Sequence, residues 1–265
     1  MEGDGSAVIR RFRHDGWAVL PAVLSADELR RVHEGLAIAT RASEDAGMPT
    51  RIEALDPGGR NVRVYDLVAG HPVFAELAAH PAVLPAVRSL LGADVILSNF
   101  TANTALPGSG SMNPHNDQST VMPEPWPRLD AMNAIWCLHD TDEGNGATRY
   151  LPGSHRFATF AEVPDDPTDG MRSFEAPAGS VILMDGRLWH TSGANTSADR
   201  ERSLLFAFYT RSYLRPHSNW WRSIPADRQR DQAAALQQLL ALAFGNMAHG
   251  VYRTTGRTCP SPPTS

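Results

Sequence analysis

Short apolar segments separated by turn residues fill the middle of the chain, from Val95 to about Tyr213. Two of these segments are 95–105 and 132–138, and Gly, Pro and Asn-Gly sequences separate the segments from one another. Runs of this length between turn residues are typical of antiparallel strands rather than of helices. The pattern therefore predicts an all-β core arranged as a double-stranded β-helix, the cupin-like jelly roll.

Helical patterns flank this core on both sides. Ser25 and Glu28 have the spacing of a capping box, and apolar residues follow at helical spacing, so a helix is expected to begin at Ser25. Two further helices are expected over residues 81–91 and 232–244. Residues 42–60 are rich in acidic residues, Gly and Pro and predict a loop. The expected fold class is thus α+β, an all-β core with flanking helices.

The length of 265 residues is enough for one large core, so residues 1–253 are expected to form a single domain with N- and C-terminal helical additions. Residues 254–265 are rich in Pro, Ser and Thr and are expected to be disordered. A formal net charge of -5 without a basic stripe argues against a nucleic-acid partner. The chain has 24 arginines and no lysine, so any permanent cation that binds a carboxylate must be an arginine.

Cysteine content and apolar run length indicate the compartment. Cys137 and Cys259 are the two cysteines of the chain, which is too few for a disulfide framework and fits a reducing cytoplasm. No early segment resembles a signal peptide, and no apolar run is long enough to span a bilayer. A cytoplasmic protein without a membrane partner is expected, and its oligomeric state stays open.

Two histidines and an aspartate predict a metal site. His115 and Asp117 are two residues apart, so on a strand their side chains would share one face. Residues 181–184 are apolar, a turn is expected at 185–186, and a second apolar run ends at His190. This order predicts a hairpin that carries His190 as a third ligand. Two imidazoles and one carboxylate form the facial triad of non-haem Fe(II) oxygenases. A His-x-Asp pair is nevertheless expected about once by chance in such a chain, and a lone histidine is more often an ordinary half-buried residue.

Three stretches of the chain together resemble one enzyme family. They are residues 12–25, which begin Phe-Arg-His-Asp-Gly-Trp, residues 143–155, which contain an Asn-Gly turn and end Pro-Gly-Ser-His, and residues 190–209. In these stretches the chain resembles the phytanoyl-CoA dioxygenase family of Fe(II)/2-oxoglutarate-dependent oxygenases. The likeness is to compact bacterial members that modify natural products, which favours a role in secondary metabolism such as antibiotic biosynthesis.

The resemblance implies that His115, Asp117 and His190 bind Fe(II), with 2-oxoglutarate and O2 as co-substrates. 2-Oxoglutarate would be oxidatively decarboxylated to succinate and CO2 while hydrogen is abstracted from a small-molecule substrate. Hydroxylation is the default outcome, with desaturation, epimerisation and cyclisation as alternatives. Family members that halogenate lack the carboxylate that Asp117 supplies, so halogenation is disfavoured.

The resemblance also implies an arginine for the far carboxylate of 2-oxoglutarate. The loop that follows His190 is one residue longer than is usual in the family, so Arg200 competes with Arg202 for this role. Arg202 is favoured because the apolar strand 204–209 follows it in the family's register.

Five polar residues are expected to contact the co-substrate: Asn99, Asn103, Asn133, Thr148 and Ser192. Ser192 is two residues beyond His190 and so shares its strand face. Each amide could equally satisfy a buried backbone group. Three residues are candidates for substrate contact: Trp126, Arg63 and Tyr65. The indole of Trp126 would either stack on a ring of the substrate or pack as a lid on the strand ends.

Two other classes of protein remain open. A jelly-roll metalloprotein with Zn(II) or Mn(II) on the same ligands could be an isomerase or a hydrolase. A silent binding protein could keep the fold without the chemistry. The first would have no use for Arg202, and the second need not retain the three metal residues.

Overall fold

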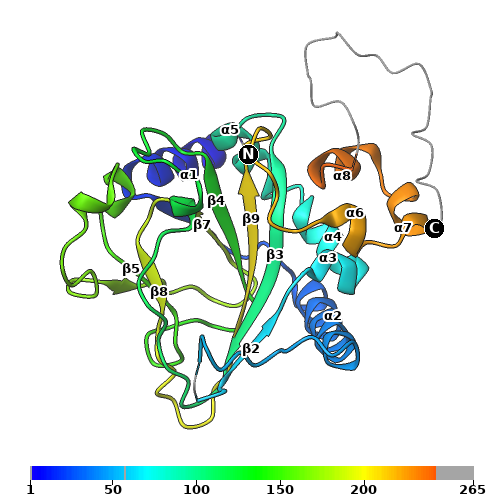
Figure 1. Ribbon diagram of the computed structural model, residues 1–265, viewed down its shortest axis with the longest axis horizontal. Helices are drawn as coiled ribbons and strands as arrows, with labels where there is room; N and C mark the ends of the chain where they lie inside the picture. The colour runs from blue at the N-terminus through cyan, green and yellow to red at the C-terminus, as the bar shows by residue number, and fades with distance from the viewer. Residues whose placement is uncertain (1, 57, 243–265) are drawn as a thin grey trace.

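The computed structural model describes residues 2–56 and 58–242, and its core consists of two antiparallel sheets that face each other (Figure 1). Over these residues, the larger sheet has six strands in the order β1-β7-β4-β9-β3-β2, and the smaller sheet has three in the order β6-β5-β8. The strands are β1 (Trp17–Leu20), β2 (Asn61–Val64), β3 (Ile96–Ala105), β4 (Ala131–Cys137), β5 (Thr148–Tyr150), β6 (Arg172–Ser173), β7 (Val181–Asp185), β8 (His190–Ser192) and β9 (Arg202–Thr210). Most neighbours in space are distant in sequence, as in a jelly roll. The predicted fold class is confirmed.

Helices cover the outer face of the larger sheet, and one apolar cluster joins them to it. The helices are α1 (Glu2–Asp15), α2 (Ala26–Asp45), α3 (Leu67–Gly70), α4 (Pro72–Ala78), α5 (Leu84–Leu91), α6 (Trp220–Ser223), α7 (Ala226–Arg230) and α8 (Ala234–Leu239), with short 3-10 turns η1 (Asp117–Thr120), η2 (Ser154–Arg156) and η3 (Phe160–Glu162). The smaller sheet covers the inner face. The larger sheet is therefore the middle layer of the molecule.

Strand β4 shows what this layering demands of the sequence. Ala134 and Trp136 belong to the cluster shared with the helices, whereas Ile135 and Cys137 belong to a second cluster between the two sheets. Successive side chains of a strand point to opposite faces. Because both faces are covered, every residue of β4 is buried, and the strand is apolar along nearly its whole length.

Two of the predicted helices are confirmed, with shifted ends. α2 begins directly after Ser25, whose backbone N–H donates to Glu28 Oε2 (2.9 Å) while the Glu28 backbone N–H donates to Ser25 Oγ (3.3 Å). This is the predicted capping box. α2 continues to Asp45, so the loop predicted for residues 42–60 begins only after that residue. The helix predicted over 81–91 is α5, which begins three residues later than expected.

The two ends of the chain differ from the prediction. α1 was not predicted, because two glycines among its first residues lower its helix propensity. The helix predicted over 232–244 is the much shorter α8. Residues 243–265, which include the segment expected to be disordered, lie outside the described residues.

The predicted hairpin before His190 is wrong. β7 pairs with β1 and β4 in the larger sheet, whereas β8 pairs with β5 in the smaller one. The turn at 185–186 is therefore a corner at which the chain passes from one sheet to the other. Turn residues between two apolar runs indicate a change of direction, but they do not specify which strand either run will pair with.

Gly186 is the tightest point of this corner. Its backbone N–H donates to the Ala131 carbonyl oxygen (2.9 Å), and a Cβ on residue 186 would lie 2.5 Å from that same oxygen. Gly186→Ala is therefore expected to lower the free energy of unfolding by ~1–3 kcal/mol, because the added carbon displaces backbone. A Cβ on Gly110 would meet nothing within 4 Å, so Gly110→Ala is the matched control. Urea denaturation of both variants measures the difference, and equal stabilities would contradict the argument.

Candidate metal centre

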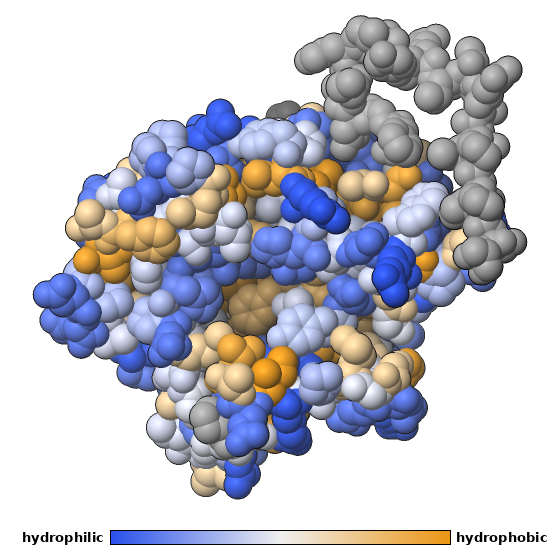
Figure 2. All heavy atoms as spheres, in the orientation of Figure 1, coloured by the Kyte–Doolittle hydropathy of each residue, from blue (hydrophilic) through white to orange (hydrophobic). Residues whose placement is uncertain are grey.

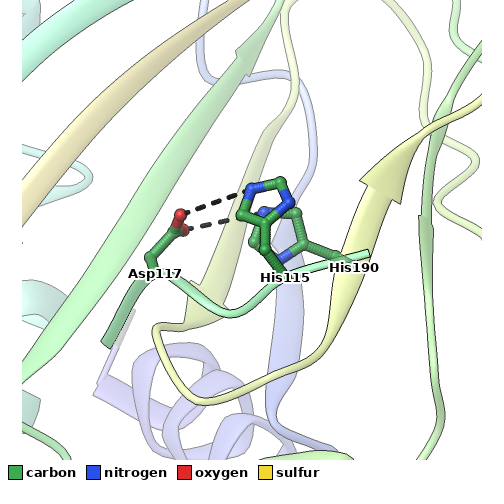
Figure 3. A group of neighbouring side chains, drawn as sticks. All are labelled: His115, Asp117 and His190. Carbon is green, nitrogen blue, oxygen red and sulfur yellow. Dashed lines mark ion pairs between the residues drawn. The ribbon is translucent and has the colours of Figure 1, made fainter. Parts of the chain in front are cut away.

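His115, Asp117 and His190 converge on one point, as Figure 3 shows. Nε2 of His115 lies 3.8 Å from Asp117 Oδ1, and Nε2 of His190 lies 3.7 Å from Asp117 Oδ2. The three candidate ligand atoms lie within 4.8 Å of one another. Two imidazoles and one carboxylate grouped in this way form a facial triad, which leaves other coordination positions of a metal ion open.

Backbone hydrogen bonds fix which ring nitrogen of each histidine faces this point. Nδ1 of His115 lies 3.0 Å from the Asn113 carbonyl oxygen, and Nδ1 of His190 lies 2.9 Å from that of Leu188. A carbonyl oxygen only accepts, so each Nδ1 donates and each Nε2 keeps a free lone pair. Such bonds hold metal-binding imidazoles in a single orientation.

The two histidines are joined through their backbones. The His115 N–H donates to the His190 carbonyl oxygen (2.9 Å), and the His190 N–H donates to the His115 carbonyl oxygen (2.8 Å), as an isolated antiparallel bridge. Asp117 is not on a strand but is the first residue of η1. The expectation that His115 and Asp117 share a strand face is therefore wrong, although both side chains reach the same point.

Gln118 explains why the chain leaves the strand conformation here. Its side chain is fully buried, and its Oε1 accepts from the backbone N–H groups of Asp130 and Ala131 (2.8 and 3.2 Å). Its own backbone N–H donates to the Gly186 carbonyl oxygen (2.8 Å). These bonds anchor η1 to the start of β4 and to the corner after β7, which turns the Asp117 carboxylate toward His190.

Asn133 supports the carboxylate from β4. Its Nδ2 donates to Asp117 Oδ2 (2.7 Å), while its buried Oδ1 has no partner among the described residues. An amide that donates to a metal-binding carboxylate restricts the rotation of that carboxylate. Asn133 was expected to touch the co-substrate, and its contact in this structure is with Asp117.

Burial favours the neutral form of His190. Its exposed fraction is 5%, and desolvation lowers the pKa of its ring, against the opposing effect of the Asp117 carboxylate. The neutral imidazole is the form that binds a metal ion.

Arg202 is a fully buried cation at the first residue of β9. Its Nε and Nη2 donate to the Gly146 carbonyl oxygen (3.0 and 2.6 Å), and its Nη1 donates to that of Asn103 (3.2 Å). None of the carboxylates in the described part of the chain pairs with it, and burial lowers its pKa to about 10. Three of the five N–H donors of a guanidinium are thus occupied, which leaves one on each terminal nitrogen.

Arg200 has a different environment. It is on the surface, where Nη1 and Nη2 donate to the two carboxylate oxygens of Asp142 (2.5 and 3.1 Å). Its guanidinium is therefore already paired, and Arg200 does not line the cavity that contains Arg202.

A cavity of about 330 Å³ lies between the two sheets and contains the metal-site residues and Arg202. Figure 2 shows this face of the molecule hollowed near its centre, with apolar surface inside the hollow, hydrophilic residues above it and apolar residues along its lower edge. The cavity wall includes all five predicted co-substrate residues and two of the three predicted substrate residues: Asn99, Asn103, Asn133, Thr148, Ser192, Arg63 and Tyr65. Strand pairing explains this, because Arg63 is opposite Asn103 and Thr148 is opposite Ser192.

The family model described as phytanoyl-CoA dioxygenase matches residues 12–203. The chain belongs to this family. Dioxygenase af480 of Aspergillus fumigatus is 42% identical over 232 residues, which cover 88% of this chain and 75% of the relative. The predicted enzyme class, a dioxygenase, is confirmed.

Two solved structures share the fold of this phytanoyl-CoA dioxygenase family member. The epimerase SnoN, solved with Fe3+, alpha ketoglutarate and nogalamycin RO, superposes with a TM-score of 0.64 at 22% identity, over 83% of this chain and 90% of its own. HygX of Streptomyces hygroscopicus, solved with nickel, 2-oxoglutarate and hygromycin B, gives a TM-score of 0.60 at 20% identity, over 79% of this chain and 88% of its own. At these identities the likeness establishes the fold.

Trp126, the third residue predicted to contact substrate, does not line the cavity. Its side chain is buried, its Nε1 donates to the Val121 carbonyl oxygen (2.7 Å), and its ring packs edge-on against Phe160, with the centroids 4.9 Å apart. Trp126 therefore packs instead of facing the cavity, but its partners are Val121 and Phe160 rather than the strand ends of the stated alternative.

Several residues of the cavity wall were not predicted: Thr101, Met112, Asn116, Ser119, Thr120, Phe206, Phe208 and His217. Phe206 and Phe208 are four and six residues after Arg202, so alternation along β9 could have found them. Thr101 lies on β3 two residues from Asn99 and two from Asn103, so alternation along that strand could have found it as well. His217 has no such signal, because it lies beyond the strands.

No helix in the described ranges is both long and apolar enough to cross a membrane.

Asn133→Leu tests the support of the metal site. Leucine has a similar volume but no donor, so the Asp117 carboxylate gains rotational freedom, and affinity for a divalent metal ion should fall ~10–100-fold. Met132→Leu is the matched control, because the Met132 side chain belongs to the cluster on the opposite face of β4. Titration of each apo-protein with Fe(II) under anaerobic conditions measures the change, and equal affinities in the two variants would contradict the assigned role.

Proposed function

We propose that this family member is a non-haem Fe(II)/2-oxoglutarate-dependent dioxygenase that hydroxylates a small molecule. The observation that carries the proposal is Arg202, a buried guanidinium without a carboxylate partner in the described residues, which lines the same cavity as a facial triad. A buried charge without a partner is costly. A dianionic co-substrate bound between the triad and Arg202 would remove that cost.

The donor set fits iron. His115, Asp117 and His190, which all line the cavity, would hold Fe(II) there. When bound, Fe(II) with 2-oxoglutarate and O2 supplies the oxidising chemistry, in which 2-oxoglutarate becomes succinate and CO2. The protein positions the reactants and excludes water. Burial of His190 and the bond from Asn133 to Asp117 serve the first task, and the two sheets that form the cavity wall limit the access of water from their sides.

The free N–H groups of Arg202 match the far carboxylate of 2-oxoglutarate. One donor remains on each terminal nitrogen, and two parallel donors are what a carboxylate accepts from a guanidinium. Ser192 Oγ accepts from the Met112 backbone N–H (3.1 Å), so its own hydrogen is free to donate to the same carboxylate. Thr148, directly opposite Ser192, is the second hydroxyl at this end.

Arg63 lies at the same end of the cavity. It is opposite Asn103 on the neighbouring strand, its Nη2 contacts Met112 Sδ (3.1 Å), and its buried Nε has no partner among the described residues. Its charge contributes to the lowered pKa of Arg202. We therefore assign Arg63 to the co-substrate end, as a second cation near the far carboxylate, rather than to substrate recognition.

Hydroxylation is the reaction we propose, because it needs no catalytic group beyond the metal site. Retention of Asp117 disfavours halogenation, since the carboxylate occupies the position that a halide would need. Desaturation, epimerisation and cyclisation use the same residues and remain alternatives. The solved relatives that contain nogalamycin RO and hygromycin B support a natural product as the substrate and a role in secondary metabolism. We also place the enzyme in the cytoplasm, as the low cysteine content suggests.

An anaerobic titration with Fe(II) and then 2-oxoglutarate tests the metal site. The wild-type protein should develop the weak visible absorption band of an iron–keto acid chelate, and His115→Ala should not, because it loses one of three ligands. His14→Ala, at an exposed histidine of α1, is the control and should keep the band. Absence of the band in folded wild-type protein would favour an isomerase, a hydrolase or a silent binding protein on the same fold.

Substitution of each arginine tests the carboxylate clamp. Arg202→Gln should raise the apparent dissociation constant for 2-oxoglutarate ~10–150-fold, because it removes charged hydrogen bonds worth ~1.5–3 kcal/mol, whereas Arg200→Gln should change it less than ~3-fold. 2-Oxovalerate lacks the far carboxylate and controls for misfolding. Arg202→Gln should lose the preference for 2-oxoglutarate over 2-oxovalerate, and a larger loss in Arg200→Gln would reverse the assignment.

A further inference from the structure

Beyond the metal ligands and the residues assigned to the co-substrate at Arg202, several residues of the cavity wall have no role yet, and Asn99, which was expected at the co-substrate, lies among them. We call one group of these residues the mouth region. This mouth region consists of Tyr65, Asn99, Thr101, Phe206, Phe208 and His217. Phe206 and Phe208 give it an apolar wall on β9, and Tyr65 is exposed at its edge. The side chains of this region make it a site for an apolar molecule with a small number of polar groups.

An irregularity in β3 builds one side of the mouth region. Leu97 pairs with Tyr209, but Asn99 pairs with Phe208, so Ser98 is the extra residue of a β-bulge. Residues two apart on a regular strand share a face. Because of the bulge, Leu97 instead joins the helix-side cluster while Asn99 faces the cavity.

Ser98 also fixes the segment that begins at His217, after the last strand, at the edge of the cavity. The His217 backbone N–H donates to Ser98 Oγ (3.0 Å), and the Ser218 backbone N–H donates to the Ser98 carbonyl oxygen (2.8 Å). The carboxylate of Asp66 accepts from the hydroxyls of Ser218 and Ser223. These bonds connect a segment after the last strand to the entrance of the site.

His217 is thereby presented to the mouth region in a defined orientation. Its ring packs on Phe208, with centroids 5.4 Å apart and an interplanar angle of 31°. Asn99 Nδ2 lies 3.4 Å from His217 Nδ1, and an amide nitrogen only donates, so Nδ1 accepts. The ring hydrogen is then on Nε2, where it can be donated to a ligand oxygen.

The charges of the cavity exclude one class of substrate. Among the described residues of its wall, Asp117 is the only carboxylate, and it belongs to the metal site. Arg63 and Arg202 are both cations. When 2-oxoglutarate is bound, its far carboxylate pairs with Arg202 and lies near Arg63, so an ammonium group would meet no free anion in this wall, which disfavours aminated substrates.

On the basis of the proposed dioxygenase function, we infer that the primary substrate is an uncharged, largely apolar molecule. Its body packs on Phe206 and Phe208, and its hydroxyl or carbonyl oxygen accepts a hydrogen bond from Nε2 of His217. His217 is thus a substrate-binding residue, and Ser98 and Asp66 are the residues that position it.

Four naphthalene probes with a common ring test this inference: 2-naphthylmethanol, 2-methylnaphthalene, 2-naphthylmethylammonium and 2-naphthoate. Each is titrated, by its fluorescence, into anaerobic protein loaded with Fe(II) and 2-oxoglutarate. The alcohol should bind about tenfold more tightly than the ammonium, because the ammonium loses its hydration without gaining an anionic partner. His217→Phe keeps the ring but removes the donor, so it should weaken binding of the alcohol ~2–10-fold and leave that of 2-methylnaphthalene unchanged. His14→Phe, at an exposed histidine of α1, should change neither.

Tighter binding of the ammonium or of the naphthoate than of the alcohol would overturn the inference, as would failure of all four probes to bind. An equal loss for the alcohol and for 2-methylnaphthalene in His217→Phe would also overturn the assigned hydrogen bond. The iron–keto acid band is recorded in the same samples. A missing band refutes the proposed function, whereas a normal band with no discrimination among the probes refutes only the substrate class.

Discussion

The backbone bridge between His115 and His190 is the constraint on which the site depends. Two reciprocal hydrogen bonds join residues 75 positions apart, one before β4 and one at the start of β8. The bridge places the two rings with their centroids 4.4 Å apart, on the side where Asp117 turns in. The three ligands are therefore preorganised, because the conformational entropy of bringing them together is already lost when the chain folds.

A second constraint is the burial of Arg202. Two backbone carbonyl oxygens satisfy three of its donors, but carbonyl dipoles only partly replace the water that a guanidinium loses. The lowered pKa of this residue, about 10, has the same cause. A charge held in this way favours an anionic ligand in the cavity, and such a ligand would stabilise the folded protein by binding to it alone. If Arg202 binds the co-substrate as proposed, it would also make the fold more stable when that co-substrate is present.

The sequence predicted those features that depend on residue type and short spacing. The capping box at Ser25 is local, so it could be found without knowledge of the fold. The grouping of His115, Asp117 and His190 followed from ligand chemistry together with the family resemblance, because the residue types alone would match by chance. The hairpin before His190 failed because turn residues do not encode the partner strand, and the strand placement of Asp117 failed because Gln118 is anchored by residues that come later in the chain. Long-range pairing decides both, and no local pattern contains it.

Strand alternation alone does not predict which residues form the mouth region. Strand periodicity correctly grouped Asn99 with Asn103, yet it would also have grouped Asn99 with Leu97, which faces the opposite layer because Ser98 is a bulge. His217 is held at the cavity by the bond of its backbone N–H to the bulge residue Ser98, together with the bonds that Asp66 accepts from Ser218 and Ser223. The metal-site residues and Arg202 are held largely by backbone pairing within the core, as are Phe206 and Phe208 at the mouth, whereas Asn99 and His217 depend on one inserted residue and on a segment after the last strand. Substitutions at the mouth could change the substrate while the iron chemistry stays intact, which is how one scaffold supports many oxidations.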